Sequence, residues 1–469
     1  MLFNSSVFVA FMALTLGAYW GLQSDRLRQW LLVLVSLVFY GWWDYRFVPL
    51  ILYVTAIAYA GAQAIERWPT LRKKIITAVI ALQLGQLAFF KYTNFLLETL
   101  RDLLGAVGTD LPVTKLSIIL PIGVSFYTFH GISYVVDVYR GKLDRAQSLR
   151  VVALYIVFFP QLVAGPIVRA DAFIPQLFRR ARLESRDVIV ACKFIVIGMI
   201  YKGLFADRLA PLVDTIFKRP ESYDNATLIT GALGFYSQIY FDFVGYSTMA
   251  IGISRLFGFK LSKNFDFPYR ASSITDFWRR WHISLSSWLR DYLYIPLGGN
   301  RDGTWKQYRN LILTMLLGGL WHGASYNFIL WGGLHGLALA LHKFFATRFP
   351  VGQQGWLAPF RTASGWLCTQ AFVLVAWVPF RAESFKDTQV VLQALTLQRA
   401  DGNLKNAALP LSLLLVPIVV DHMLTYNPYL KRFHWPARPI LVTAVLALCF
   451  ALALPLLQME VQNFIYFQF

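Results

Sequence analysis

The chain has 469 residues, enough for two or three ordinary soluble domains, but its composition excludes that organisation. Hydrophobic residues make up 57% and charged residues only 15%, whereas soluble domains carry about 25% charged residues. The net charge of +19 fits the basic cytoplasmic loops of a membrane protein, so it does not indicate nucleic-acid binding. We therefore predict an all-α polytopic membrane protein.

Apolar stretches recur along the whole chain, and a membrane span needs about 20 apolar residues. No internal repeat or soluble segment separates these stretches, so we expect one membrane domain over residues 1–469 with about 10–12 spans. The candidate stretches are 3–22, 30–43, 47–64, 75–97, 118–138, 151–167, 188–206, 228–256, 310–342, 363–380, 408–424 and 439–457.

The N-terminal stretch has no basic residue before Arg26, so it lacks the basic region of a cleavable signal and we interpret it as a retained span. Basic residues collect in cytoplasmic loops, and Arg26 and Arg28 therefore place the first loop inside. The N-terminus is then predicted to lie in the periplasm.

Residues 151–167 break the alternation of loop charges. If this stretch crossed the membrane, the basic loop at 169–186 would lie outside, against the usual distribution of charge. Pro160, Gly165 and Pro166 favour a break within it. We predict a re-entrant hairpin, since irregular backbone at membrane depth is tolerated only inside the protein or beside a wet cavity.

Residues 310–342 form a second such stretch, because they are too long for one ordinary crossing. We expect breaks at Gly318–Gly319 with Gly323, and again at Gly332–Gly333. Two re-entrant elements in one chain favour a funnel over a sealed bundle.

The stretch from Asp276 to Tyr294 predicts one amphipathic, basic helix at the cytoplasmic interface, with its apolar face toward the protein or the lipid boundary. Its polar face carries Arg279, Arg280 and Arg290, and His282 falls within the apolar arc. The apolar face consists of Trp278, Trp281, Leu285, Trp288, Leu289, Tyr292 and Leu293.

Two histidines are candidates for chemistry. A lone His282 is best explained as a packed side chain with a hydrogen-bond partner. His322, however, lies deep in the glycine-broken stretch, and an ionisable side chain inside a span is a functional hypothesis by default. Histidine also exchanges protons near neutral pH, so we predict both as catalytic residues.

The remaining polar residues give weaker signals. His335 and His342 have no carboxylate or cysteine near them, and a catalytic metal normally takes three protein ligands, so we expect no metal and interpret both as packing or interface residues. Asp242 is an intramembrane carboxylate that either pairs with an arginine or a backbone group, which we favour, or serves in a proton relay.

Several stretches together resemble the membrane-bound O-acyltransferase family, and within it the membrane subunits of bacterial alginate and other exopolysaccharide acetylation. They are 120–126, 159–166, 240–247, 277–301, 318–323 and 464–469. The family core would then cover about 118–345, followed by further spans within 363–457. The resemblance implies a ring of tilted helices around a thin central funnel, with re-entrant and interfacial helices.

The resemblance also implies the reaction, which is acetyl transfer from cytoplasmic acetyl-CoA to an acceptor on the periplasmic side of the bacterial inner membrane, either a partner protein or a polysaccharide hydroxyl. His322 matches the family's catalytic histidine, and His282 matches its second histidine or asparagine position. We assign His322 as the general base for the acceptor hydroxyl. His282 would orient the thioester or polarise its carbonyl.

Binding partners follow from the same resemblance. Arg279, Arg280 and Arg290, with Trp278 beside them, are candidates for binding the donor, although interfacial anchoring explains the arginines equally well. No permanently bound cofactor is expected. Relatives work with a periplasmic SGNH-type acetyltransferase on an exopolysaccharide of the alginate or cellulose type.

Two other classes of function stay open. Broken helices and Asp242 would suit a polysaccharide or lipid transporter or flippase, but the chain lacks an inverted repeat and carries the family-like histidine pair. A scaffold that only anchors a polymer-modifying complex is the third possibility. In that case His322→Ala would leave polymer acetylation intact.

Overall fold

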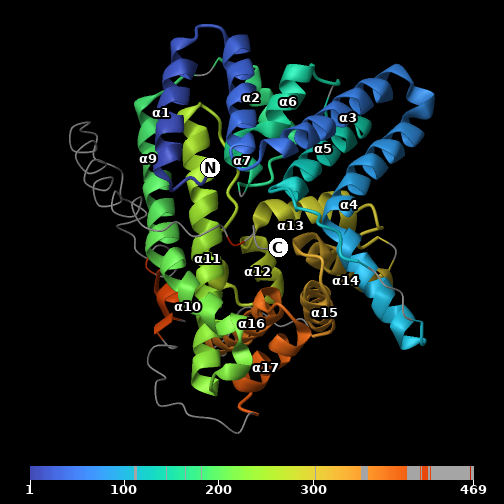
Figure 1. The fold of residues 1–469 in the computed structure, drawn as a ribbon, viewed down its shortest axis with the longest axis vertical. Coiled ribbons are helices and arrows are strands. Elements are labelled where there is room, and N and C mark those ends of the chain that lie inside the picture. Colours follow the sequence, from blue (N-terminus) through green and yellow to red (C-terminus); the bar gives the residue numbers. More distant parts are fainter. Residues whose placement is uncertain are drawn as a thin grey trace. The chain divides into compact units, whose positions relative to one another are not determined.

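The computed structural model describes most of the chain up to residue 398 and a few residues beyond it. The described residues are 1–109, 114–143, 145–163, 165–180, 182–301, 303–349, 358–398, 412–413, 415–420, 423 and 465. Across these ranges all regular secondary structure is helical, which confirms the all-α prediction (Figure 1). The candidate stretch 439–457 and about half of 408–424 lie outside the described residues.

The helices pack into two compact units, which are described separately. The first unit comprises Met1–Ile195 with Met249–Ser262, and the second comprises Val196–Thr248 with Lys263–Phe469. That residues 1–469 form a single membrane domain, and that the helices form a ring around a funnel, stay predictions.

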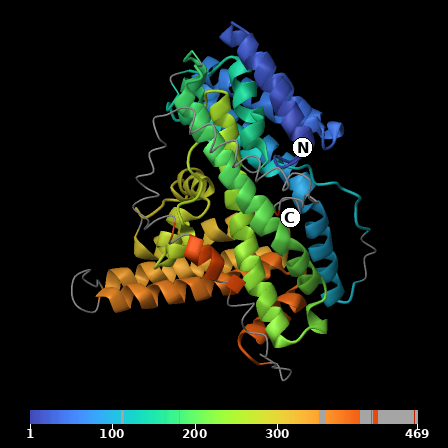
Figure 2. The same ribbon diagram turned by 90° about the vertical axis from the view of Figure 1, so that its left-hand side faces the viewer.

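Most helices of the first unit coincide with predicted apolar stretches. In Figures 1 and 2 the blue helices α1 and α2 lie side by side. The elements that begin in this unit are α1 (Ser6–Gly21), α2 (Asp25–Gly41), η1 (Tyr45–Phe47), α3 (Val48–Arg67), η2 (Pro69–Leu71), α4 (Arg72–Ala106), α5 (Val124–Tyr139), α6 (Leu149–Val157), α7 (Phe159–Leu162), α8 (Ala170–Leu177) and α9 (Ser185–Met199).

The second unit holds the candidate site. Its gold and orange helices include α15, which lies against both α14 and α16 (Figures 1 and 2). The elements are η3 (Ile200–Ala206), α10 (Asp207–Lys218), η4 (Pro220–Ser222), α11 (Asn225–Leu256, which ends in the first unit), η5 (Pro268–Arg270), α12 (Ile274–Arg280), α13 (Ile283–Leu289), η6 (Arg290–Tyr294), α14 (Thr304–His322), α15 (Tyr326–Arg348), α16 (Ala358–Arg381) and α17 (Phe385–Leu395).

Within the described residues, five helical segments are long and apolar enough to cross a membrane. They are Tyr45–Arg67, Pro69–Ala106, Ser185–Lys218, Tyr326–Arg348 and Ala358–Arg381. The protein is therefore a multi-pass membrane protein. The total of about 10–12 spans stays a prediction.

The predicted break within 151–167 is confirmed. The helix stops at Phe158, between α6 and α7, and α6 has only nine residues. At 1.5 Å per residue α6 is about 13 Å long, less than half of the roughly 30 Å of a bilayer core. Residues 151–163 are buried, as broken backbone at membrane depth requires, although re-entry itself stays a prediction.

The predicted breaks within 310–342 are only partly right. The chain does break, once, at Gly323–Ser325 between α14 and α15, whereas Gly318–Gly319 and Gly332–Gly333 lie inside the helices. The reason is close packing. A Cβ on Gly332 would lie 2.4 Å from the Met315 carbonyl oxygen, so these glycines let the two helix backbones touch.

The single amphipathic helix predicted from Asp276 to Tyr294 is wrong. The stretch forms two short helices, α12 and α13, and a π-helical turn, η6. Helix α12 ends at Arg280, and His282 adopts a left-handed conformation with φ of 42°. The predicted apolar face is nevertheless buried at Trp278, Trp281, Leu285, Trp288 and Leu289.

Candidate active site

His322 is the last residue of α14, at the turn that leads into α15. The turn needs glycine at the next position, because a Cβ on Gly323 would lie 1.9 Å from the Phe328 ring. The Phe328 ring in turn packs edge-on against Phe380 of α16, at 5.1 Å between centroids. Close packing around the turn therefore fixes where the histidine backbone lies.

Aromatic rings surround the His322 imidazole, whose residue is only 4% exposed. Trp321 and Trp331 each lie 4.9 Å from it between ring centroids, and Phe380 lies at 5.1 Å. Trp331 also stacks on Trp377 of α16. The predicted histidine is thus buried among three helices, in a setting with little water.

His282 is fully buried at the kink between α12 and α13. Its Nδ1 lies 3.1 Å from the side-chain Oδ1 of Asn264, and the Ser284 hydroxyl donates to the same oxygen at 2.8 Å. Two phenylalanines confine the ring, with centroids at 4.6 Å for Phe243 and 6.3 Å for Phe265. The kink lies outside the five candidate spans, and burial lowers the pKa of His282 to about 3. The imidazole is therefore neutral at physiological pH.

One ring connects the two histidines. Trp321 lies 6.3 Å from His282 and 4.9 Å from His322 between ring centroids. The structure thus brings together the two residues that the sequence predicts as catalytic, although they are 40 positions apart in the chain. Asn264 was missed, because a lone asparagine in a mixed loop carries no recognisable pattern.

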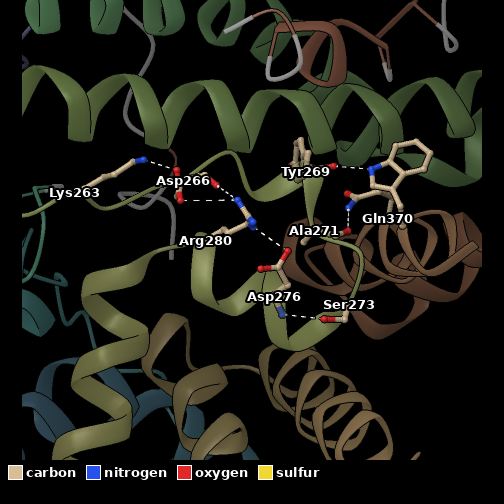
Figure 3. A network of polar contacts seen from close by, with 9 residues as sticks. Lys263, Asp266, Tyr269, Ala271, Ser273, Asp276, Arg280 and Gln370 are labelled. Atoms are coloured by element: carbon tan, nitrogen blue, oxygen red, sulfur yellow. Dashed lines mark hydrogen bonds and ion pairs between the residues drawn. The ribbon is translucent and has the colours of Figure 1, made fainter. Parts of the chain in front are cut away.

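The predicted donor-binding residues have different surroundings. Arg279 is exposed, while Arg280 pairs with Asp276 at 2.9 Å and with Asp266 at 3.9 Å (Figure 3). Arg290 pairs with Asp291 at 2.6 Å. These ion pairs leave Arg279 as the exposed cation of α12.

Trp278 has a structural contact of its own. Trp278 is buried, and its indole Nε1–H donates to Nδ1 of His335 at 3.2 Å. This contact confirms the interpretation of His335 as a packing residue. His342 Nδ1 lies 2.9 Å from the Thr275 hydroxyl.

Side chains of a neighbouring helix donate hydrogen bonds to backbone carbonyl groups of the loop before α12. The indole of Trp366 donates to the Tyr269 carbonyl at 2.9 Å, and the Gln370 amide donates to the Ala271 carbonyl at 3.0 Å (Figure 3). Both donors lie on α16, which also contributes Phe380 to the His322 surroundings. Helix α16 therefore supports both parts of the candidate site.

Asp242 pairs with a cation, although with a lysine rather than the predicted arginine. Lys202, in the π-helical turn η3, lies 2.9 Å from Asp242 and 2.6 Å from Asp207. The backbone amide of Ile465 donates to the other Asp242 oxygen at 2.8 Å, which confirms the predicted backbone contact. Gly245 permits this approach, since a Cβ there would lie 2.9 Å from the Lys202 amide nitrogen.

Fold and site together define a class of protein, an α-helical multi-pass membrane protein in which two histidines are buried beside one tryptophan. No group of three metal-binding side chains occurs among the described residues. The family model for the membrane-bound O-acyltransferase family matches residues 144–381, which include both histidines. The chain belongs to this family and is an acyltransferase that uses an acyl donor.

Named relatives match most of the chain. The probable alginate O-acetylase AlgI of Azotobacter vinelandii is 42% identical over 395 residues, which cover 82% of this chain and 76% of the relative. The peptidoglycan O-acetyltransferase of Helicobacter pylori is 36% identical and covers 84% of this chain and 80% of its own length. The teichoic acid D-alanyltransferase of Bacillus subtilis is 30% identical over 48% of this chain and 59% of its own length.

Proposed function

We propose that this protein transfers an acetyl group from cytoplasmic acetyl-CoA to a hydroxyl group on the periplasmic side of the bacterial inner membrane, with His322 as the general base. The observation that carries the proposal is the burial of His322 at the α14–α15 turn, one tryptophan ring from His282. Two relatives that share at least 82% of this chain are named as O-acetyl-transferring proteins, which supports acetyl as the group transferred.

The chemistry needs a base, because a hydroxyl group has a pKa far above 7 and is a poor nucleophile while protonated. In the proposal, the neutral imidazole of His322 takes the hydroxyl proton as the oxygen attacks the thioester carbonyl. The tetrahedral intermediate then expels the thiolate of CoA, and the imidazolium returns the proton to that sulfur. Atoms and charge balance, since an ester and a thiol replace an alcohol and a thioester.

The position of His322 at the end of a helix supports this role. The carbonyl groups of the last helical turn carry a partial negative charge, and a cation there is stabilised by about 0.3–1 kcal/mol. The imidazolium that forms during transfer would lie at this end of α14. Buried aromatic rings around it would keep water away from the thioester.

Acetyl-CoA is proposed to bind beside the arginines of α12. Arg279 is the first candidate for a CoA phosphate because it is exposed, while Arg280 and Arg290 would have to share their present carboxylate partners. Trp278 is a further candidate for binding the donor, because it precedes Arg279 in α12. His282 is assigned to orienting the thioester.

The acceptor is proposed to be a carbohydrate polymer of the cell envelope. The relatives are named for alginate, peptidoglycan and teichoic acid, so the names agree on a cell-surface polymer and differ in which one. We propose that a periplasmic SGNH-type acetyltransferase passes the acetyl group on to an exopolysaccharide. In this arrangement the N-terminus lies in the periplasm.

Acetyl transfer from radiolabelled acetyl-CoA tests the proposal in detergent or in liposomes. Wild type is compared with His322→Ala, His282→Ala and the control His342→Gln, which alters a half-buried histidine bound to Thr275. We expect CoA release to fall about 10²–10⁴-fold in His322→Ala, the usual contribution of a general base. The control should stay near the wild-type rate.

The acceptor supplied in the assay decides how a negative result is interpreted. CoA release is therefore measured with water alone, with an oligosaccharide, and with the periplasmic transferase of the same organism. Unchanged release in His322→Ala would contradict the base assignment. Release that requires the transferase would support transfer through a partner protein.

A further inference from the structure

The hydrogen bonds around Asn264 determine which side-chain atom faces His282. The backbone N–H of Ser284 can only donate, and it points at the Asn264 side chain at 3.2 Å. The atom that receives it must therefore be the carbonyl oxygen Oδ1 and not the amide nitrogen. The Ser284 hydroxyl donates to the same oxygen at 2.8 Å.

This oxygen in turn fixes the proton on His282. Because Oδ1 of Asn264 is an acceptor without a hydrogen atom, the His282 Nδ1 that lies 3.1 Å from it must carry the proton and donate. A neutral imidazole has only one N–H, so Nε2 is left with a lone pair. Across the part of the chain that the structure describes, the buried Nε2 has no hydrogen-bond partner.

The backbone is arranged to maintain this contact. A non-glycine residue with positive φ is strained, and His282 adopts φ of 42°. Two backbone hydrogen bonds hold the strained residue from both sides. The Ile283 amide donates to the Asn264 carbonyl at 2.8 Å, and the Asp266 amide donates to the Arg280 carbonyl at 2.9 Å.

We infer that Asn264 is a positioning residue that holds His282 in its Nδ1–H tautomer, so that Nε2 accepts a hydrogen bond from an amide N–H of the pantetheine arm of the donor. This inference rests on the proposed function and favours one of the two roles predicted for His282. A neutral imidazole in this tautomer has no N–H left for the thioester carbonyl. It therefore orients the donor and does not polarise the carbonyl.

Nitrogen-15 NMR of histidine-labelled protein in lipid tests the tautomer directly, with His282→Gln to assign the signal. In wild type we expect a protonated Nδ1 and an unprotonated Nε2 at position 282. Asn264→Ala removes the acceptor, and the Nε2–H form should then appear. Asn264→Asp keeps an acceptor oxygen at the position of Oδ1, so the wild-type tautomer should be retained even if the alanine variant folds poorly.

Asn310→Ala is the matched control. Asn310 is also a buried asparagine of this unit, and its amide donates to two backbone carbonyl groups, those of Leu297 and Gly299, at 3.0 Å each. This variant also loses the hydrogen bonds of a buried asparagine side chain but does not touch His282, so the tautomer should stay unchanged. An Nε2–H signal in wild type, or an unchanged signal in a folded Asn264→Ala protein, would overturn the inference.

The ligand is tested with CoA, which has the pantetheine amides but no acetyl group to transfer. Its binding is measured by calorimetry, and the Nε2 resonance is followed as CoA saturates the protein. A shift at Nε2 of position 282 supports the inference, whereas binding without a shift overturns it. Absence of CoA binding would instead contradict the donor in the proposed function, and the two failures can therefore be distinguished.

Kinetics give a second readout. Loss of one orienting hydrogen bond should lower kcat/KM for acetyl-CoA about tenfold in Asn264→Ala, and Asn264→Asp should restore most of it. A merely structural asparagine would not show rescue by the carboxylate together with an unchanged tautomer. Equal loss in both variants, with the tautomer retained in Asn264→Asp, would contradict the positioning role.

Discussion

The turn that carries His322 and the kink that carries His282 differ in what holds the side chain. Around His322 the described contacts are three aromatic rings and a glycine pressed against Phe328. Around His282 they are also three aromatic rings, those of Phe243, Phe265 and Trp321, together with hydrogen bonds that converge on Asn264. Packing fixes where an imidazole lies, whereas hydrogen bonds also fix which nitrogen carries its proton. At His282 the hydrogen bonds therefore fix both the place of the imidazole and its protonated nitrogen, which suits this residue to holding the donor in one orientation.

The largest effect on activity should come from Gly323→Ala, which disturbs the packing around the turn that carries His322. The new Cβ would lie 1.9 Å from the Phe328 ring, so the turn must shift and take His322 with it. A misplacement of about 1 Å can cost about 100-fold in rate. Acetyl-transfer assays on the purified variant measure the loss. Gly85→Ala in α4, whose Cβ would meet nothing within 4 Å, is the control. A wild-type rate in Gly323→Ala would show that the turn does not position the base.

A neighbouring pair of glycines tests whether packing of α14 on α15 supports the same turn. A Cβ on Gly332 would lie 2.4 Å from the Met315 carbonyl oxygen, while one on Gly333 would meet Leu316 at 3.6 Å, an ordinary contact. Gly332→Ala should therefore lower stability by about 1–3 kcal/mol, and Gly333→Ala should raise it slightly through helix propensity. Thermal unfolding in detergent measures both. Equal melting temperatures would mean that the helices are not in close contact there.

The same comparison shows how far the sequence alone could go. His322 and Gly323 could be recognised because their signal is local, a polar residue and a glycine inside an apolar stretch. The single break at Gly323–Ser325 could not, because glycines that break a helix and glycines that let two helices touch look alike in sequence. Only the partner helix distinguishes them.

The kink at His282 was out of reach for a different reason. The periodicity of apolar residues fits a continuous helix, and the tryptophans of the predicted apolar face are buried although His282 is left-handed. The hydrogen bonds that select the kink come from Asn264, 18 residues earlier in an irregular loop. The lysine partner of Asp242 was missed likewise, because Lys202 lies on another helical segment.

Acid should weaken the hydrogen-bonded kink that carries His282. The folded pKa of His282 is about 3, while the unfolded value is about 6.5, so below that value only the unfolded chain takes up the proton. Stability is therefore lost as the pH falls, by about 2 kcal/mol between pH 7 and pH 5. Thermal unfolding at both pH values should show a smaller loss in His282→Gln. Equal losses in wild type and variant would mean that His282 is charged in the folded protein.

The smallest effect should come from Trp278→Phe, which separates packing from hydrogen bonding at a third histidine. Phenylalanine fills much of the ring volume but cannot donate to Nδ1 of His335, which the indole reaches at 3.2 Å. We expect a loss of about 1 kcal/mol in stability, the usual net contribution of one hydrogen bond. The KM for acetyl-CoA should stay unchanged if the indole serves only this contact. A KM that rises severalfold, with the melting temperature unchanged, would instead favour the donor-binding role predicted for Trp278. In that case the polar contacts of α12 would serve the substrate as well as the fold, and His282 would not be the only residue of the kink that orients the donor.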